Sequence, residues 1–177
     1  MRRWRINAAM VGGVLLSLSI ATLIYQRVAP SQQFKHAQQH WNTHKPDRYR
    51  LMVKYQTLSD LPGCEQAVEV QQEAIARVLQ DTCQNQLNLV PPMTVSDIFV
   101  RFYPQATEQT CGPNGCQCDG VIRVHATYDH QLGYPRQIES RLERDWFNPL
   151  HWQLNHPCTS IGFIGERIEV VSLESLP

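Results

Sequence analysis

The sequence predicts an α+β protein, in which an antiparallel β-sheet with one or two packed helices is preceded by a single N-terminal transmembrane helix. Three observations indicate this fold. Short stretches with alternating apolar residues are typical of half-buried strands. Other stretches have apolar residues at helical spacing. An uncharged stretch near the N-terminus has the length of a membrane span, and the 177 residues suffice for one further domain.

The uncharged stretch covers residues 8–25, AAMVGGVLLSLSIATLIY. As a helix it would rise about 27 Å, close to the thickness of the hydrocarbon core of a bilayer. Three arginines and no acidic residue precede it, so the positive-inside bias predicts a cytoplasmic segment at residues 1–7 and export of everything that follows. A cleaved signal peptide is the alternative. The cleavage pattern around Ala29 is poor, which favours a retained signal anchor.

The charge of the exported part limits its partners. Residues 1–30 contain four arginines and no acidic residue, while the whole chain is formally neutral, so the rest carries a net charge of −4. We expect no nucleic-acid partner, because phosphate contacts require clustered Lys and Arg. The expected partners are the membrane and an unidentified protein or small molecule. The expected location is the cell membrane, with a single span and a C-terminal domain that is extracytoplasmic, either periplasmic or extracellular.

The first expected element after the span is an amphipathic juxtamembrane helix within residues 26–46. Phe34, Ala37 and Trp41 recur at helical spacing on one side of it, and Pro46 is expected to end it. The exported domain is expected over residues 47–177. It begins with a strand in which every second residue is apolar or aromatic: Tyr49, Leu51, Val53 and Tyr55.

The next stretch, residues 64–83, permits two interpretations. Its apolar residues would form one face of a helix. They would equally form a hairpin with Glu73-Ala74 as its two-residue turn. That register pairs Val68 with Leu79 and places Cys64 opposite Cys83, within the span of a disulfide. Glu-Ala lacks the Gly or Asn that is typical of such turns, so the residues alone do not decide.

A short helix and several strands are expected in the remainder. Thr94 and Asp97 resemble a capping box, and Pro104 is expected to end the helix that follows. The buried face of this helix would consist of Val95, Ile98, Phe99 and Phe102. A long antiparallel hairpin is predicted from residues 119–129 and 136–144, and one or two further strands from residues 151–154 and 164–173.

The order of these motifs resembles the bacterial family of domains of unknown function numbered 6174. The similar positions are Trp41, Tyr49-Arg50, Cys64 with Val68-Glu69-Val70, Thr94-Val95 with Phe99, residues 111–120 (CGPNGCQCDG) and residues 124–135 (V-x-A-T-Y-D-x-x-L-G-Y-P), of which residues 128–135 (YDHQLGYP) are the most specific. The resemblance covers about residues 41–154. It implies an exported or membrane-attached α+β domain without catalytic residues to transfer, and it favours the hairpin for residues 64–83. Unlike lipoprotein-like members, this chain has no early lipid-acceptor cysteine.

All six cysteines lie on the expected exported side, where thiols become oxidised: Cys64, Cys83, Cys111, Cys116, Cys118 and Cys158. We predict three disulfides, which join Cys64 to Cys83, Cys111 to Cys116 and Cys118 to Cys158. The alternative is a metal-dependent or redox enzyme that uses the cluster of Cys111, Cys116 and Cys118. The spacing of the first two lies within the range of zinc ligands, but a redox centre more often has C-x-x-C on a helix.

A second candidate for metal binding is a row of histidines. His36, His40 and His44 recur every four residues, a spacing that stacks their side chains along one flank of a helix. Such a row could bind a transition metal, or it could be a solvated flank opposite the apolar residues. No carboxylate is interleaved with these histidines, so we assign no metal site and no cofactor.

The hairpin end at residues 128–135 is a candidate ligand-binding edge formed by Tyr128, Asp129 and Tyr134, because exposed aromatic and polar groups on loops often recognise partners. In the alternative interpretation, Asp129 binds backbone donors of the turn and the tyrosines pack. The sequence contains no nucleophile elbow, phosphate-binding Gly-rich loop or paired-carboxylate pattern. We therefore assign no catalytic residue and favour a noncatalytic binding or structural module over an enzyme.

Overall fold

The computed structural model describes residues 30–58, 62–83, 90–108, 110–112, 115–116, 120–143 and 165–177. The predicted cytoplasmic segment and the predicted membrane span, residues 1–7 and 8–25, lie outside this part of the chain. Within the described residues, no helix is both long enough and apolar enough to cross a bilayer.

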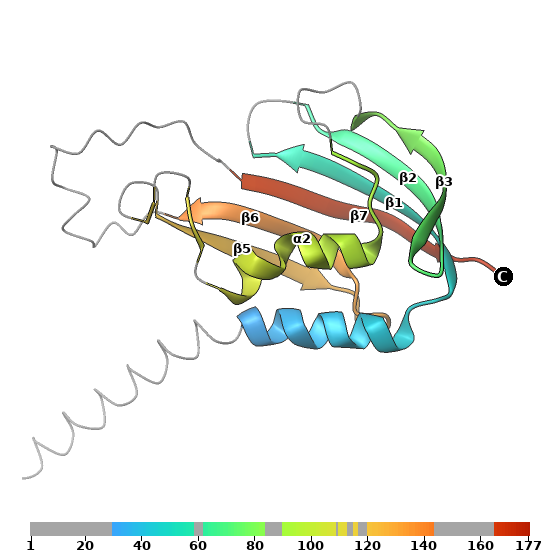
Figure 1. The fold of residues 1–177 in the computed structure, drawn as a ribbon, viewed down its shortest axis with the longest axis horizontal. Helices are drawn as coiled ribbons and strands as arrows, with labels where there is room; N and C mark the ends of the chain where they lie inside the picture. The colour runs from blue at the N-terminus through green and yellow to red at the C-terminus, as the bar shows by residue number, and fades with distance from the viewer. Residues whose placement is uncertain are drawn as a thin grey trace, which may run out of the picture.

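The described residues form one sheet of seven strands with two helices on one of its faces (Figure 1). The strands are β1 (Arg48–Thr57), β2 (Cys64–Gln71), β3 (Ala74–Asp81), β4 (Thr110–Cys111), β5 (Val121–Tyr128), β6 (Pro135–Glu143) and β7 (Gly165–Ser175). They follow the order β3-β2-β1-β7-β6-β5-β4, and each neighbouring pair is antiparallel. The helices are residues 30–44 and α2 (Val95–Thr107). The α+β class with an antiparallel sheet is confirmed.

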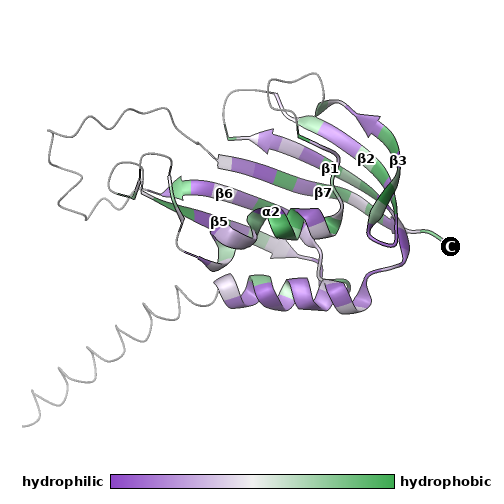
Figure 2. Ribbon diagram, viewed as in Figure 1, coloured by the Kyte–Doolittle hydropathy of each residue, from purple (hydrophilic) through white to green (hydrophobic). Residues whose placement is uncertain are grey.

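The core lies between the helices and the inner face of the sheet. The alternate residues of β1, from Tyr49 to Tyr55, are buried, as their period of two predicts. Hydrophilic and hydrophobic positions alternate visibly along the strands (Figure 2). The helix at residues 30–44 buries Phe34, Ala37 and Trp41. Edge-to-face ring contacts join Phe34 to Phe99 of α2 at 5.4 Å and Trp41 to Tyr49 at 5.6 Å, so this helix is anchored to both layers.

Residues 64–83 form the hairpin of β2 and β3, but the predicted turn is wrong, and the predicted register holds only near the open end. The turn residues are Gln72 and Glu73, both with positive φ, and Val68 lies opposite Val78 rather than Leu79. Two irregularities in the register, after Ala67 and after Glu69, shift the pairing by one residue each. The shifts restore the expected register near the open end of the hairpin, where Cys64 and Cys83 form a disulfide.

The α2 helix begins as predicted and ends later than predicted. The Thr94 hydroxyl accepts a hydrogen bond from the Asp97 amide, and the Asp97 carboxylate accepts one from the Thr94 amide, which completes the capping box. The predicted buried face is confirmed. Pro104 does not end the helix, because proline lacks an N–H but its carbonyl still accepts a hydrogen bond, here from the Glu108 amide.

The predicted long hairpin is confirmed as β5 and β6, and residues 165–175 supply the predicted last strand as β7. Strand β7 lies between β1 and β6, so it joins the first strand of the domain to the long hairpin. The other predicted strand, at residues 151–154, lies outside the described residues.

Candidate functional site

The β5 strand forms most of one edge of the sheet. Its outer neighbour β4 has two residues, which pair with Val121 and Ile122 near the start of the eight-residue strand. The rest of this edge, from Arg123 to Tyr128, has no strand partner among the described residues. Free strand edges are sites where another chain can pair.

The backbone groups that face this edge follow from the hydrogen bonds beside it. Gly112 donates its N–H to the Gly120 carbonyl, so even-numbered residues of β5 direct their backbone groups toward β4. Asp129 donates to the Tyr134 carbonyl, which places odd-numbered residues on the β6 side. The N–H and C=O groups of Val124, Ala126 and Tyr128 therefore point to the free edge.

A half-open groove of about 1140 Å³ surrounds this edge. The first turn of the helix at residues 30–44, the last turn of α2 and the strands β5 and β6 line it. On the helix side the lining includes Phe34, Ala106, Val124, Ala126 and Tyr128. These residues are apolar or aromatic, whereas Gln33, Gln105 and Thr107 are polar members of the same lining, and the strand residues are half-buried rather than buried.

One polar atom in the groove wall has no partner. The Gln105 side-chain oxygen Oε1 is buried and accepts no hydrogen bond from a described residue. A buried acceptor without a donor is costly, because the group has lost its hydrogen bonds to water.

On the outer side of the groove, opposite charges neutralise one another. Glu143 contacts Arg123 at 3.2 Å and His125 at 3.1 Å. Glu139 is buried and accepts hydrogen bonds from Arg141 at 2.6 Å and Arg167 at 2.7 Å. Burial alone would raise the pKa of Glu139, but these arginines outweigh it and lower the pKa.

Of the predicted ligand-binding edge, the structure places Tyr128 alone in the groove lining. The Tyr128 ring stacks on Phe99 with the ring centres 6.5 Å apart, and burial raises its pKa. The Asp129 carboxylate accepts hydrogen bonds from the amides of Gln131 and Leu132, both at 2.9 Å. Tyr134 packs edge-on against Trp41 at 6.3 Å. The three residues thus lie near one another without converging on one site.

The turn between β5 and β6 holds the N-terminal helix against the sheet. Gly133 has a φ of +80°, and a Cβ atom there would lie 2.8 Å from the Ala37 carbonyl oxygen and 3.0 Å from His40. Glycine is the residue that permits both this φ and this approach. Asp129 and Tyr134 thus have the structural roles of the alternative interpretation of this turn, and Gly133 permits the close contact with the helix.

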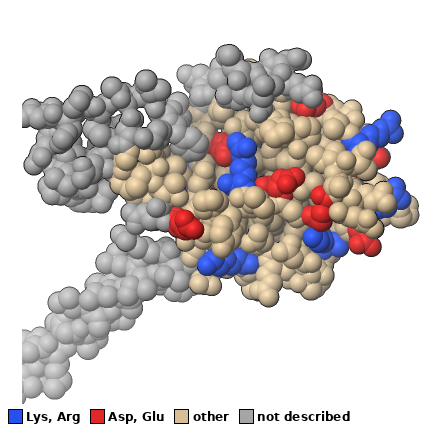
Figure 3. Space-filling view, viewed as in Figure 1, with Lys and Arg blue, Asp and Glu red and all other residues tan. Residues whose placement is uncertain are grey.

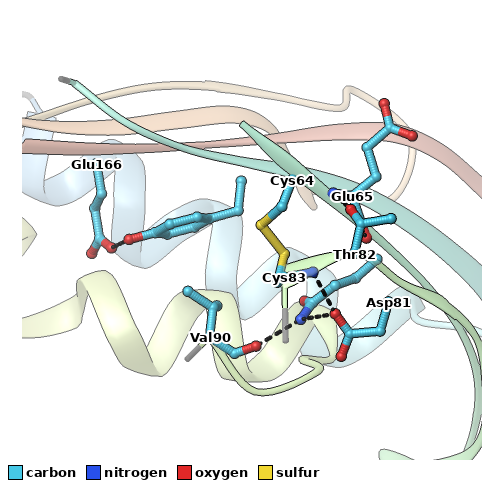
Figure 4. Close-up of a disulfide and its surroundings, with 9 residues drawn as sticks. Cys64, Glu65, Asp81, Thr82, Cys83, Val90 and Glu166 are labelled. Atoms are coloured by element: carbon cyan, nitrogen blue, oxygen red, sulfur yellow. Dashed lines mark hydrogen bonds between the residues drawn. A yellow bond between two sulfur atoms is a disulfide. The ribbon is translucent and has the colours of Figure 1, made fainter. Parts of the chain in front are cut away.

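Two of the three predicted disulfides are present. Cys64 and Cys83 have a Cα–Cα distance of 5.1 Å, and both residues are buried (Figure 4). Gln66 is also buried, and its amide nitrogen donates to the Val90 carbonyl at 2.8 Å. Cys111 and Cys116 are joined as well. Their sulfur atoms bond each other, which does not favour the alternative metal or redox cluster. Cys118 and Cys158 lie outside the described residues, so their pairing stays a prediction.

The histidine row lies on the N-terminal helix as its spacing predicts. The rings of His40 and His44 stack at 4.2 Å, and those of His36 and His40 at 6.4 Å. The ring nitrogen Nδ1 of His44 lies 3.0 Å from the His40 carbonyl oxygen. Within the described residues, no group of three or more His, Cys, Asp or Glu side chains could hold a metal ion.

The sequence does not indicate one polar cluster that the structure contains. The Glu166 carboxylate on β7 accepts hydrogen bonds from Arg101 of α2, at 2.6 to 3.1 Å, and from the Tyr55 hydroxyl at 3.1 Å. Burial and the Glu166 charge raise the pKa of Tyr55 to about 12. Tyr55, Arg101 and Glu166 are far apart in the chain, so this cluster belongs to no local sequence pattern. The cluster ties α2 to the centre of the sheet.

Comparison with known proteins identifies the family. No curated protein and no solved structure is significantly similar to the chain. The model of a family of unknown function, DUF6174, matches residues 33–144. This span is more than half of the chain and runs from the N-terminal helix to the end of β6. The match begins at residue 33, before the expected start of the resemblance at about residue 41. It ends at residue 144, before the expected end at about residue 154. The chain belongs to the DUF6174 family.

Proposed function

We propose that this protein is a membrane-tethered, extracytoplasmic binding module without catalytic activity, and that its ligand site is the groove at the free edge of β5. The observation that carries the proposal is the combination at this edge of unpaired backbone groups and a groove whose lining contains apolar and aromatic side chains. Binding sites are typically concave, mostly apolar and equipped with a few oriented polar groups.

The location rests on the sequence and is supported by the cysteines. The uncharged segment at residues 8–25 follows three arginines, which favours a retained span with an exported C-terminal domain. Two disulfides in the folded domain fit an oxidising compartment, because cytosolic thiols are kept reduced. The helix at residues 30–44 would then connect the membrane to the domain, with the groove beside its first turn.

The absence of catalysis is supported by the chemistry of the groove. Of the three carboxylates in its lining, Glu139 and Glu143 are engaged with arginines or with His125, so these two are poor candidates for a free general base. On the visible face of the molecule, Lys and Arg alternate with Asp and Glu (Figure 3). Such mixed charge supports a protein or small-molecule ligand rather than a nucleic acid.

The location is tested with the full chain carrying a reporter enzyme after Pro177 that is active only in an oxidising compartment. The proposal predicts an active, membrane-bound reporter, and alkylation of the denatured chain before reduction should leave Cys64, Cys83, Cys111 and Cys116 unmodified. A matched fusion that lacks residues 1–29 should be inactive and should alkylate at these cysteines. An inactive full-length fusion with four alkylated cysteines would overturn the proposed location.

A further inference from the structure

We propose that the ligand of the groove is an extended polypeptide segment, which binds as an added antiparallel strand along β5. This inference rests on the proposed function only in taking the groove as the ligand site. Its chemistry follows from the backbone, the apolar side chains of the lining and the charges around the edge.

The backbone of β5 presents the pattern that an added strand requires. Val124, Ala126 and Tyr128 direct their N–H and C=O groups to the free edge, and no described residue pairs with them there. An antiparallel segment would form hydrogen-bonded pairs with these three residues and would extend the row begun by β4. Peptide recognition by strand addition draws its affinity from such main-chain hydrogen bonds.

The two edges of the sheet differ in the way that this proposal needs. Strand β3, at the opposite edge, has two register irregularities within eight residues, and such irregularities hinder further pairing. The irregularity in the β5–β6 pairing places the extra residue, Arg136, on β6, so β5 itself stays regular. The edge of β5 is therefore the one that remains suited to a partner strand.

The walls of the groove select a single extended chain. Residues that pair with Val124, Ala126 and Tyr128 would direct their side chains to the helix side, toward Phe34 and Ala106. Apolar side chains suit these alternate positions, and polar ones suit the positions between them. The first turn of the N-terminal helix and the last turn of α2 flank this side, so a partner segment there would lie between the helix ends and the strand.

The C-terminal end of α2 favours a ligand with a positively charged side chain at that end of the groove. Its last turn contains no basic residue, and Glu108 directly follows it. The negative end of the helix dipole and the Glu108 carboxylate thus act together at one end of the groove. No described residue forms an ion pair with Glu108 within 4.0 Å, whereas the other carboxylates of the lining have partners. A Lys or Arg near the C-terminal end of the added strand would complement this end.

The test uses the full chain in detergent micelles and the synthetic peptide acetyl-Val-Thr-Val-Thr-Lys-amide, in which the lysine would lie opposite Val124 and on the helix side. We expect saturable binding, and we expect hydrogen exchange of the amides of Val124, Ala126 and Tyr128 to slow at least about tenfold when the peptide is bound. The amides of Arg123, His125 and Thr127 already face β6, so their exchange should change little.

Two matched peptides isolate the main-chain hydrogen bonds. N-methylation of the valines removes the N–H groups that would face β5, and it should weaken binding at least about tenfold. N-methylation of the threonines removes N–H groups that face away, and it should leave most of the affinity. Replacement of the lysine by glutamine should weaken binding to the wild-type chain but not to the Glu108→Gln variant. The Ala126→Pro variant should lose binding, since proline is tolerated on an edge strand but has no N–H.

Three results would overturn the inference: no saturable binding at millimolar peptide, equal affinity of the two N-methylated peptides, or dimerisation of the free chain that protects the same three amides and resists the peptide. The last result would assign the edge to a second copy. None of these results depends on where the domain is located. An inactive reporter fusion would instead overturn the proposed location and leave the peptide result standing.

Discussion

Gly133, in the turn between β5 and β6, lies directly against the carbonyl oxygen of Ala37 in the N-terminal helix. This approach connects the turn at residues 128–135, whose sequence resembles the DUF6174 family, with the helix that precedes the sheet. A Cβ atom at Gly133 would lie 2.8 Å from that oxygen, and the φ of +80° is itself unfavourable for other residues. The turn therefore acts as the contact that fixes this helix in place.

Replacing Gly133 by Ala should reduce the free energy of unfolding by about 2–4 kcal/mol, from backbone strain and overpacking together. Gly115→Ala is the matched control, because Gly115 has a φ of +84° but no atom within 4 Å of a Cβ placed there. The control should cost about 1 kcal/mol, from strain alone. Urea unfolding of the full chain measures both, and equal losses would contradict the packing role of Gly133.

The two disulfides should differ in their contribution to stability. Cys64 and Cys83 are 19 residues apart and buried, whereas Cys111 and Cys116 are 5 residues apart. Loop-closure entropy predicts about 3 kcal/mol for the first pair and about 2 kcal/mol for the second. Double substitution by alanine in each pair, followed by urea unfolding under nonreducing conditions, measures the contributions. A larger loss for the short loop would contradict this ranking.

Glu166 should be more important for stability than an exposed glutamate in an ion pair. Glu166→Ala removes the acceptor for Arg101 and Tyr55 and should cost about 2 kcal/mol, while Tyr55→Phe should cost about 1 kcal/mol. Glu174→Ala is the control, because Glu174 is 62% exposed and 4.0 Å from Arg50, and it should change stability by less than about 0.5 kcal/mol. Thermal unfolding that gives the same loss for both glutamates would refute the structural role of the cluster.

Glu139 should make stability depend on pH in the acid range. The arginines lower the pKa of Glu139 below its ordinary value of 4.5, so ionised Glu139 stabilises the folded state. This contribution is complete above pH 4.5 and is lost as the pH falls through the lowered pKa. Glu139→Gln should therefore lose less stability than the wild type between pH 5 and the acid limit of folding, as measured by urea unfolding at each pH. A Glu174→Gln control should retain the wild-type dependence, and an unchanged slope for Glu139→Gln would contradict the account.

Local patterns were sufficient to predict most of the elements. The alternation in β1, the capping box at Thr94 and the apolar spacing around Trp41 each depend on residues close in sequence. The position of the β2–β3 turn was not predictable, because Gln72 and Glu73 lack the usual turn chemistry. The Glu73 carboxylate contacts Lys45 at 3.5 Å and is hydrogen-bonded to Ser96, so contacts distant in sequence favour this turn.

The candidate site was the least predictable feature. The groove combines the ends of two helices with a strand edge, and no local pattern indicates which strand of a sheet will lie at its edge. Tyr128 carries a sequence signal as an aromatic residue near a turn, but the site is defined mainly by the backbone of β5. Backbone groups carry no sequence signal when the strand order is unknown.

The proposed binding site requires that the edge of β5 is open and available for a ligand. Amide hydrogen exchange along β5, measured by NMR on the ligand-free full chain, tests it most directly. We predict alternation, in which Val124, Ala126 and Tyr128 exchange at least an order of magnitude faster than Arg123, His125 and Thr127, because the latter donate to β6. Equal protection of all six amides would show that the edge is already paired, and it would contradict the binding site proposed for this protein.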